Sequence, residues 1–193
     1  EIIQSLSKTL DMVSKGTGFY KKTEESNYFY GPKPKSMNVE NIQASYPTNI
    51  LKGYTVTDKA DGETTILYIS NNGGLYLIDT NMNVHIIADE KIGAEAGLKN
   101  CVLIGEYIHT TLPSFYCFDC YLSDGKDTRL LPLVAKQGID SRIGTANSII
   151  DSLKKLGNIG FDFNVKNFYW SASQSIFSLT QSVWEKRDRY PYR

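Results

Sequence analysis

The segment Thr57-Asp58-Lys59-Ala60-Asp61-Gly62-Glu63 contains the residues best suited to covalent chemistry. Lys59 follows a β-rich run. A lysine amine is a nucleophile only when it is neutral, so it needs desolvation or nearby cations, and a rigid element must aim it. Asp61 could orient a ligand or the lysine, and Gly62 could let the backbone pass close to a ligand. Taken alone, such a segment is more often a solvated charged turn.

Two strand-like segments with acids follow the lysine. Ile104-Gly105-Glu106-Tyr107 places an acid at the end of an apolar run, and Phe115-Tyr116-Cys117-Phe118-Asp119 is aromatic and ends in an acid. The ordered set Lys-x-Asp-Gly, Gly-Glu and Phe-Asp resembles the first motifs of the covalent nucleotidyltransferases. These include the ATP-dependent DNA ligases, the RNA ligases and the GTP-using mRNA capping enzymes. The Lys-x-Asp-Gly pattern by itself is weak, and the order of the three motifs carries the resemblance.

Finer details resemble the guanylyltransferase domain of mRNA capping enzymes, in particular those of large cytoplasmic DNA viruses. They are the linker at residues 124–133, the Ser141-Arg142-Ile143 start of a helix, and the stretch at residues 182–192. Polynucleotide ligases usually carry Glu two residues before the lysine, where it reads adenine. This chain has Thr57 there, which favours GTP. The resemblance covers about residues 50–193, and residues 1–49 contribute little to it.

The resemblance implies a reaction in two steps. Lys59 would attack the α-phosphate of GTP, form a lysyl-N-GMP intermediate and release pyrophosphate, and GMP would then pass to the 5′-diphosphate end of RNA. Mg²⁺ or Mn²⁺ is expected, because phosphoryl transfer depends on neutralising the charge of the phosphate oxygens. The protein ligands of that metal are left unassigned.

The same resemblance implies roles for the residues around the lysine. Phe118 would stack on guanine, and Glu106 would accept the ribose hydroxyls or hold a metal through water. The remaining nucleotide-binding positions would line the base pocket or lie near the lysine and the ribose: Thr57, Asp58, Asp61 and Gly62.

Three departures leave alternatives open. The chain has Thr64 where the family often has arginine, Ile104 where an acid is common, and Asn71 or Asn72 in place of a hairpin arginine. The alternatives are an ATP-dependent DNA or RNA ligase domain and a degenerate, non-catalytic nucleotide-binding module. The later motifs and an OB domain would lie beyond Arg193, so the chain is expected to be a partial nucleotidyltransferase with little activity of its own.

The elements that position these residues follow from the hydrophobic pattern. Helices are expected over residues 1–15 and 141–156, with an irregular segment at 15–49 between the first helix and a set of short strands. The expected fold class is α+β, a DNA ligase-like (ATP-grasp-like) nucleotidyltransferase with antiparallel β-sheets flanked by helices. The expected division is an N-terminal part, 1–49, and a partial nucleotidyltransferase domain, 50–193. The expected strands are 54–57, 65–69, 74–78, 84–87, 101–104, 115–118 and 161–165, with a hairpin turn at 71–74.

Composition restricts the partners and the compartment. The 21 basic and 21 acidic side chains argue against a polybasic tail, and the basic clusters Lys21-Lys22 and Lys33-Pro34-Lys35 are more often solvated than bound to RNA. No apolar run reaches the length of about 18 residues that a membrane span needs, so no membrane partner is expected. The resemblance implies a cytoplasmic, viral setting (a viral factory or a virion) and further capping domains in the same polypeptide or complex.

The three cysteines are too few for a disulfide framework and favour a reducing compartment. Cys117 and Cys120 have a metal-like spacing, but strand alternation predicts that they face opposite sides of the sheet. His85 and His109 are expected to be surface or hairpin residues rather than ligands.

Overall fold

The computed structural model describes residues 1–14, 29–32, 34–136, 139–157, 159–170 and 173–186. The chain forms two compact units. Unit 1 comprises Glu1–Gly31 and Gly62–Val165, and unit 2 comprises Pro32–Asp61 and Lys166–Arg193. The division at residue 49 stays a prediction. Lys21, Lys22, Lys33 and the arginines at 187, 189 and 193 lie outside the described residues.

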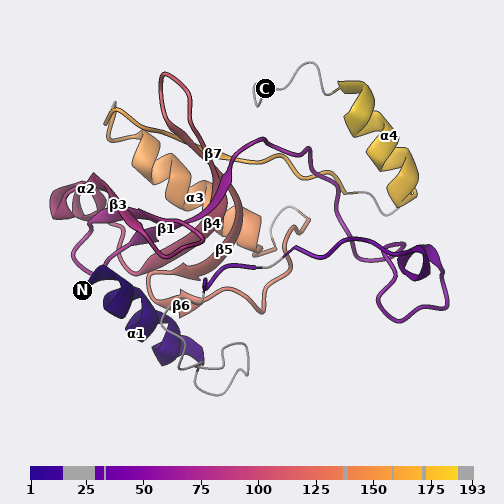
Figure 1. Ribbon diagram of the computed structural model, residues 1–193, viewed down its shortest axis with the longest axis horizontal. Helices are drawn as coiled ribbons and strands as arrows, with labels where there is room; N and C mark the ends of the chain where they lie inside the picture. Colours follow the sequence, from indigo (N-terminus) through magenta and orange to yellow (C-terminus); the bar gives the residue numbers. More distant parts are fainter. Residues whose placement is uncertain (15–28, 33, 137–138, 158, 171–172, 187–193) are drawn as a thin grey trace. The chain divides into compact units, whose positions relative to one another are not determined.

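Unit 1 is built on one twisted sheet, which has seven strands among the described residues (Figure 1). The strand order is β3-β2-β1-β4-β5-β6, and every pair in this path is antiparallel. The last strand, β7, pairs in parallel with β5. The strands are β1 (Glu63–Ile69), β2 (Leu75–Ile78), β3 (Val84–Ala88), β4 (Cys101–Ile108), β5 (Ser114–Ser123), β6 (Lys126–Asp127) and β7 (Asp162–Val165).

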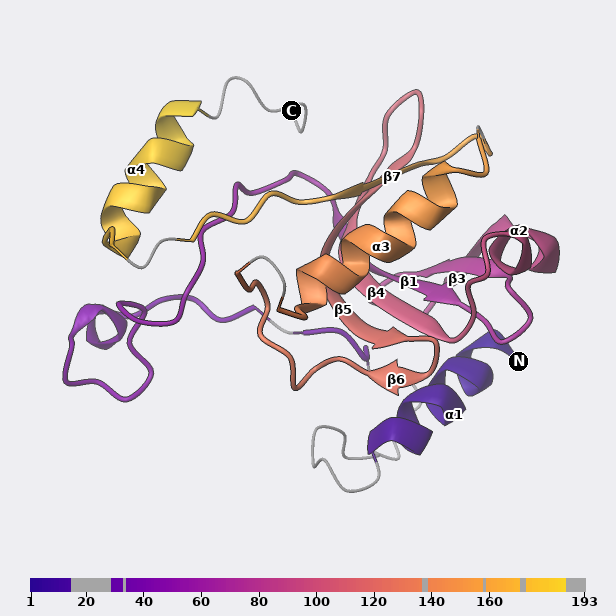
Figure 2. The same ribbon diagram turned by 180° about the vertical axis from the view of Figure 1, so that it is seen from behind.

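Two helices cover opposite faces of this sheet (Figures 1 and 2). On one face, α1 (Ile2–Ser14) buries Leu6 and Leu10 against the even-numbered side chains of β1, such as Ile66. On the other face, α3 (Arg142–Lys154) packs on the odd-numbered side chains, such as Leu67. Each Leu or Ile buried in this way contributes about 1.5–3 kcal/mol relative to exposure. The sheet is therefore the middle layer of an α/β/α sandwich.

The ends of α3 follow from local chemistry. The Ser141 hydroxyl caps the helix by accepting a hydrogen bond from the Gly144 N–H at 3.0 Å. Gly157 lies just beyond the helix with φ +85°, a conformation that glycine adopts without strain. The helix expected at 141–156 is confirmed, and its buried face is the expected one: Ile143, Ala146, Ile149, Ile150 and Leu153.

Most of the expected helices and strands are present, and the prediction of one strand is wrong. The first helix, the hairpin turn at 71–74 and the strands expected from residue 65 onward are confirmed. The run 54–57 is not a strand, because only Val56 pairs, through a single bridge to Tyr169 in unit 2. Several elements were not expected: the short helix α2 (Glu90–Glu95), the helix α4 (Ile176–Lys186), the 3₁₀ helix at Val39–Ile42 and the strand β6.

The expectation that Cys117 and Cys120 face opposite sides of the sheet is wrong. Gly105 of β4 pairs with Cys117, and Leu103 pairs with Cys120. Two residue steps along β4 therefore correspond to three along β5, because β5 has a β-bulge there. Both thiols therefore enter the core cluster beneath α3. Burial raises the pKa of Cys120 to about 12 and that of Cys117 well above its usual value, so both act as small apolar side chains.

Candidate functional site

The lysine segment of unit 2 is anchored immediately before Lys59. Val56 and Tyr169 exchange two backbone hydrogen bonds, with N–O distances of 2.9 and 2.7 Å. The Thr57 hydroxyl donates to the Asn167 carbonyl at 2.7 Å. A strand was expected to hold Lys59 rigidly. The segment is not a strand, and these three hydrogen bonds hold it instead.

The side chain of Lys59 projects from this anchor and is 84% exposed. Its Nζ lies 3.4 Å from both Asp61 Oδ1 and the Ala60 carbonyl oxygen, while Ala60 itself is buried. Asp61 is thus within reach of the lysine amine, and its expected role in orienting the lysine stays a prediction. Within the described part of the chain, the enclosed Oδ1 of Asp58 has no hydrogen-bond partner.

Gly62 begins the second segment of unit 1 and passes directly against β4. A Cβ at this position would lie 2.7 Å from the Tyr107 carbonyl oxygen and 3.2 Å from Glu106 Cβ. The first distance is too short for a real side chain, and the second is tight. Glycine is therefore required for the close approach of two backbone segments, and this brings Gly62 next to Glu106. Its expected role toward a ligand stays a prediction.

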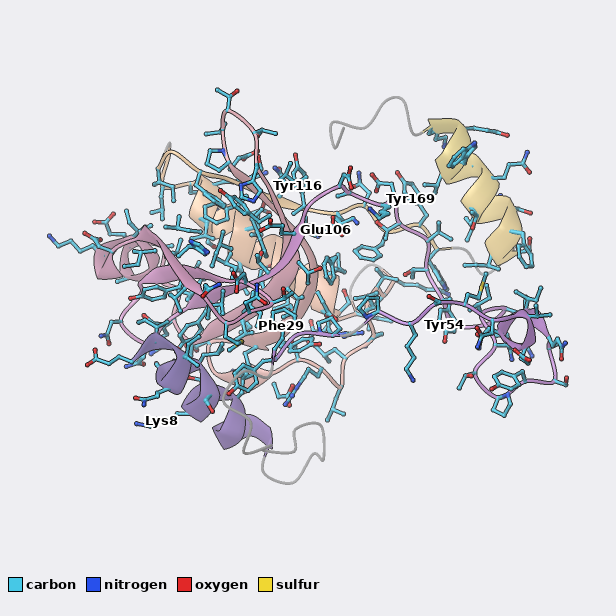
Figure 3. The ribbon with its side chains drawn as sticks, viewed as in Figure 1. Lys8, Phe29, Tyr54, Glu106, Tyr116 and Tyr169 are labelled. Atoms are coloured by element: carbon cyan, nitrogen blue, oxygen red, sulfur yellow. The ribbon has the colours of Figure 1, made fainter. Side chains whose placement is uncertain are left out.

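Glu106 belongs to a row of polar residues on the face of the sheet away from α3. Its register partners are Thr64 on β1 and Tyr116 on β5, and Tyr116 pairs in turn with Asn164 on β7. Figure 3 shows Glu106 and Tyr116 side by side. Burial and the charge of Asp162 raise the pKa of the Tyr116 hydroxyl, against a hydrogen bond with Asn164. We call Thr64, Glu106, Tyr116 and Asn164 the polar row.

Phe118 lies two residues after Tyr116 and is partly buried against the core cluster beneath α1. Thr64, one of the departures from the family pattern, is the cross-strand neighbour of Glu106 on the adjacent strand β1. Ile104 is fully buried in the same cluster, so an acid at that position would lose its water. The sequence-predicted residues thus form two groups: Gly62, Glu106 and Phe118 in unit 1, and Thr57, Asp58, Lys59 and Asp61 in unit 2.

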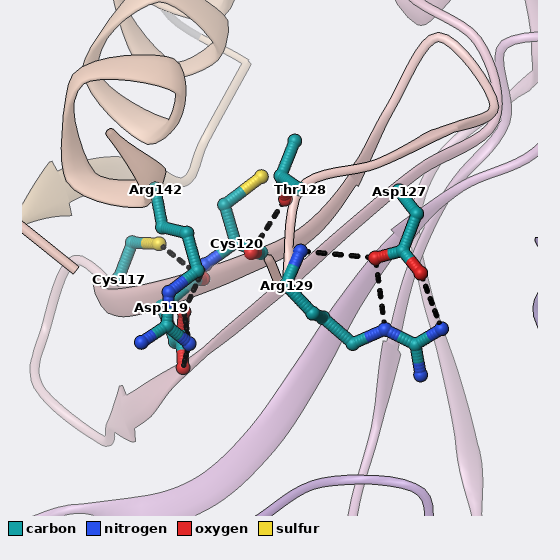
Figure 4. A network of polar contacts seen from close by, with 7 residues as sticks. All are labelled: Cys117, Asp119, Cys120, Asp127, Thr128, Arg129 and Arg142. Atoms are coloured by element: carbon teal, nitrogen blue, oxygen red, sulfur yellow. Dashed lines mark hydrogen bonds and ion pairs between the residues drawn. The ribbon is translucent and has the colours of Figure 1, made fainter. Parts of the chain in front are cut away.

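Two acid–arginine ion pairs lie near β5, one between β5 and α3 and one at the end of β6 (Figure 4). Arg142, the first residue of α3, donates from Nη1 to both Asp119 oxygens at 2.8 and 3.0 Å. Burial raises the pKa of Asp119 to about 6, although the Arg142 charge opposes this. Arg129 donates from Nε and Nη2 to Asp127 at 2.9 and 2.7 Å. Burial raises the pKa of Asp127, but these bonds bring it below its usual value.

Asp119 and Arg142 belong to separate sequence motifs, and no pairing between them was expected. They lie 23 residues apart in the chain. The pairing places the start of α3 on β5, so it is a tertiary contact with no signal in the local sequence. Among the described residues, no group of three or more acids, histidines or cysteines could hold a metal ion.

Gly105, the glycine of the Gly-Glu motif, is required by packing. A Cβ there would overlap Cζ of the fully buried Phe115 ring and would lie 2.6 Å from the Tyr116 carbonyl oxygen. We expect Gly105→Ala to destabilise the protein by about 2 kcal/mol, since overpacking typically costs 1–3 kcal/mol. A thermal melt of the 193-residue chain should show a fall in Tm of roughly 4–8 °C.

Gly144→Ala is the matched control for Gly105→Ala, because Gly144 lies on the exposed side of α3. It should change stability by less than about 1 kcal/mol, because exposed positions tolerate substitution. An equal loss of stability in both variants would contradict the packing argument.

The described part of the chain contains no helix with both the length and the apolar composition that crossing a membrane requires.

Comparison with known proteins agrees with the motif order. Residues 4–142 match the family described as "mRNA capping enzyme, catalytic domain". The match begins within α1, so it extends into residues 1–49, which contribute little to the motif resemblance. Over 146 residues the chain is 32% identical to a protein of Acanthamoeba polyphaga mimivirus named "Probable mRNA-capping enzyme". The aligned part is 70% of this chain and 12% of the mimivirus protein.

Proposed function

The chain belongs to the family of mRNA capping enzyme catalytic domains, and from this premise we propose that it is an mRNA guanylyltransferase. The observation that carries the proposal is that the family match contains Lys59, Glu106 and Phe118 in the motif order of covalent nucleotidyltransferases. The finer fold assignment, a DNA ligase-like nucleotidyltransferase with an OB domain outside this chain, is part of the proposal.

In the first step, the neutral Nζ of Lys59 attacks the α-phosphorus of GTP. An N–P bond forms, the bond from the α-phosphorus to the bridging oxygen breaks, and pyrophosphate leaves as the amine loses a proton. In the second step, a terminal oxygen of 5′-diphosphate RNA attacks the same phosphorus, and the lysine nitrogen leaves and regains a proton. The anchored backbone at Thr57 and the exposed amine of Lys59 suit a nucleophile that must reach two different partners in turn.

The polar row suits the ribose and phosphate side of the nucleotide. Glu106 is partly buried between Thr64 and Tyr116, so its carboxylate is positioned by both neighbouring strands. Carboxylate oxygens suit Mg²⁺ or Mn²⁺, and Mg²⁺ is usually held by one or two carboxylates together with substrate phosphates and water. Glu106 would hold the ion through water, and the ion would neutralise charge on the phosphate oxygens.

Base selection is assigned to Asp58, Thr57 and Phe118. The unpaired Oδ1 of Asp58 is an acceptor, and guanine presents N–H donors on its pairing edge where adenine has a ring acceptor. The exposed part of Phe118 would stack on the base. An ATP-dependent ligase remains the enzymatic alternative. A degenerate binding module is the non-enzymatic one, for which Thr64 beside Glu106 is the specific observation.

The other partners belong to the same proposal. The RNA substrate would carry a 5′-diphosphate, and further capping domains would lie in the same polypeptide or complex. The setting would be that of a viral protein acting in the cytoplasm, in a viral factory or in a virion.

The test is to incubate the natural full-length polypeptide with Mg²⁺ and either α-labelled GTP or α-labelled ATP, and then to denature it. We expect label from GTP to remain on the denatured protein and to leave when 5′-diphosphate RNA is added before denaturation. Labelling from ATP alone would identify a ligase. Binding of GTP without any covalent label would identify the degenerate module and overturn the proposal.

A further inference from the structure

Unit 1 contains a cavity of about 490 Å³ that none of the sequence-predicted site residues line. It lies on the α3 side of the sheet, because its residues Thr65 and Tyr107 alternate along β1 and β4 with Thr64 and Glu106 of the polar row. The size is within the range of small-molecule sites. The cavity and the polar row therefore occupy opposite faces of the same two strands.

Thr65 provides the first evidence for a ligand. Its side chain lines the cavity and is 2% exposed, and its Oγ1 has no hydrogen-bond partner within the described residues. An unpaired buried hydroxyl is unfavourable, whereas valine has the same shape without that penalty. A ligand that exchanges a hydrogen bond with Thr65 would remove the penalty.

The aromatic wall indicates the shape of the ligand. The rings of Tyr107 and Phe161 are nearly parallel, with an interplanar angle of 13° and centroids 5.9 Å apart. The His109 ring lies 4.2 Å from the Tyr107 ring. All three residues line the cavity, so a flat ring is the ligand shape that gains most from contact with them.

The charged groups indicate the polarity of the ligand. The cavity is lined by two acids, Glu63 and Asp79, and by two histidines, and none of the described lysines and arginines lines it. His109 Nε2 lies 3.4 Å from Glu63 Oε2. Asp79 accepts hydrogen bonds from the Asn81 and Asn83 backbones and the Asn83 side chain. These bonds lower its pKa although burial raises it. The wall therefore carries two acids and, among the described residues, neither lysine nor arginine, which favours N–H donors and disfavours phosphate.

We propose that this cavity binds a nucleobase, a planar heteroaromatic ring with N–H donors, and that no phosphate enters with it. The source is either a free nucleoside or an RNA nucleotide whose phosphates stay outside the cavity. The proposal is independent of guanylyl transfer by Lys59, because the cavity is built entirely from residues of unit 1.

The experiment titrates the natural full-length polypeptide with adenosine and cytidine by calorimetry, since neither should occupy a guanine site. Saturable binding at millimolar or lower concentration is expected. Thr65→Val should raise Kd by roughly threefold to tenfold, the equivalent of one hydrogen bond. It should also raise Tm by roughly 2–4 °C, because a buried unpaired hydroxyl is removed.

Thr9→Val is the control, since it removes a threonine hydroxyl from α1, which lies on the face of the sheet opposite the cavity. It should leave the Kd for the nucleosides within about twofold of the wild-type value, whereas His109→Ala should raise it. A short RNA that competes with adenosine identifies RNA as the source, and a lack of competition identifies the free nucleoside. The proposal is overturned by an absence of saturable binding or by a Thr65→Val protein with unchanged Kd.

Discussion

Lys59→Arg is expected to abolish covalent labelling of the polypeptide by α-labelled GTP while leaving the fold intact. A guanidinium does not lose its proton in proteins, so it has no free electron pair for attack on phosphorus. Arginine keeps the positive charge and most of the length of lysine. The variant therefore separates nucleophilic attack from simple attraction of the triphosphate.

The structure explains why this substitution should not unfold the protein. The Lys59 side chain is 84% exposed, and its two polar contacts are both at 3.4 Å. Exposed substitutions of this kind usually change stability by less than about 0.5 kcal/mol. The Tm should therefore shift by no more than about 2 °C.

Lys52→Arg is the matched control, because Lys52 is an exposed lysine of unit 2 that lies before the anchored segment. It should retain full labelling. The measurement is the label that remains on the denatured protein after equal incubation, together with a thermal melt of each variant. Label that persists in the Lys59→Arg protein would assign the nucleophile to another residue.

Arg142→Met is expected to destabilise the protein strongly near pH 7.5 and much less near pH 5. The Asp119 and Arg142 side chains are only 13% and 22% exposed, and removing one member of a buried pair leaves the other charge without compensation. Such changes cost about 3–5 kcal/mol, and the partial exposure favours the lower end. The Tm of the 193-residue chain should fall by roughly 6–12 °C at pH 7.5.

The pH dependence follows from the direction of the Asp119 shift. Burial raises the pKa of this carboxyl to about 6 from its ordinary value of 3.8, with Arg142 opposing the change. A raised pKa means that the folded state binds the proton more tightly than the unfolded state. The resulting stability is complete below about pH 4 and is lost as the pH rises through about 6. The difference of about two pKa units corresponds to about 3 kcal/mol.

Without Arg142, the pKa of Asp119 should rise further, because the opposing charge is gone. At pH 5 the carboxyl would then be neutral in the variant, and the penalty for burying it would be small. Thermal melts at the two pH values measure this rescue. The double variant Asp119→Asn/Arg142→Met should be more stable than Arg142→Met at pH 7.5. An Arg142→Met loss that is the same at both pH values would show that Asp119 is not the titrating group.

Much of the fold could be predicted from short patterns. The helix at 141–156 and the strands from residue 65 onward have the periodicity of their elements, and Gly157 follows the helix with the backbone angle that ends it. The run 54–57 had the composition of a strand but found only one pairing partner, Tyr169. A strand forms only where neighbouring strands pair with it, so composition alone could not predict whether residues 54–57 form one.

The candidate site could also be predicted only in part from the sequence. The order of Lys59, Glu106 and Phe118 was visible in the sequence and led to the family that the comparisons show. The sequence did not reveal that Thr64 and Tyr116 flank Glu106, or that Gly62 lies against it. The cavity lined by Thr65 and His109 also had no signal, since its residues come from segments up to about a hundred positions apart.

The family, the lysine segment and most of the helices and strands could thus be predicted from the amino-acid order, because they depend on local motifs and periodicity. Which residues share a face of the sheet became known only from the strand register. The register shift at Ile104/Gly105 brings Cys117 and Cys120 to one side, and the register of β1 with β4 separates the polar row from the cavity. Side chains alternate every residue along a strand. A shift of one position exchanges the two faces, and that shift is set by contacts across the whole sheet.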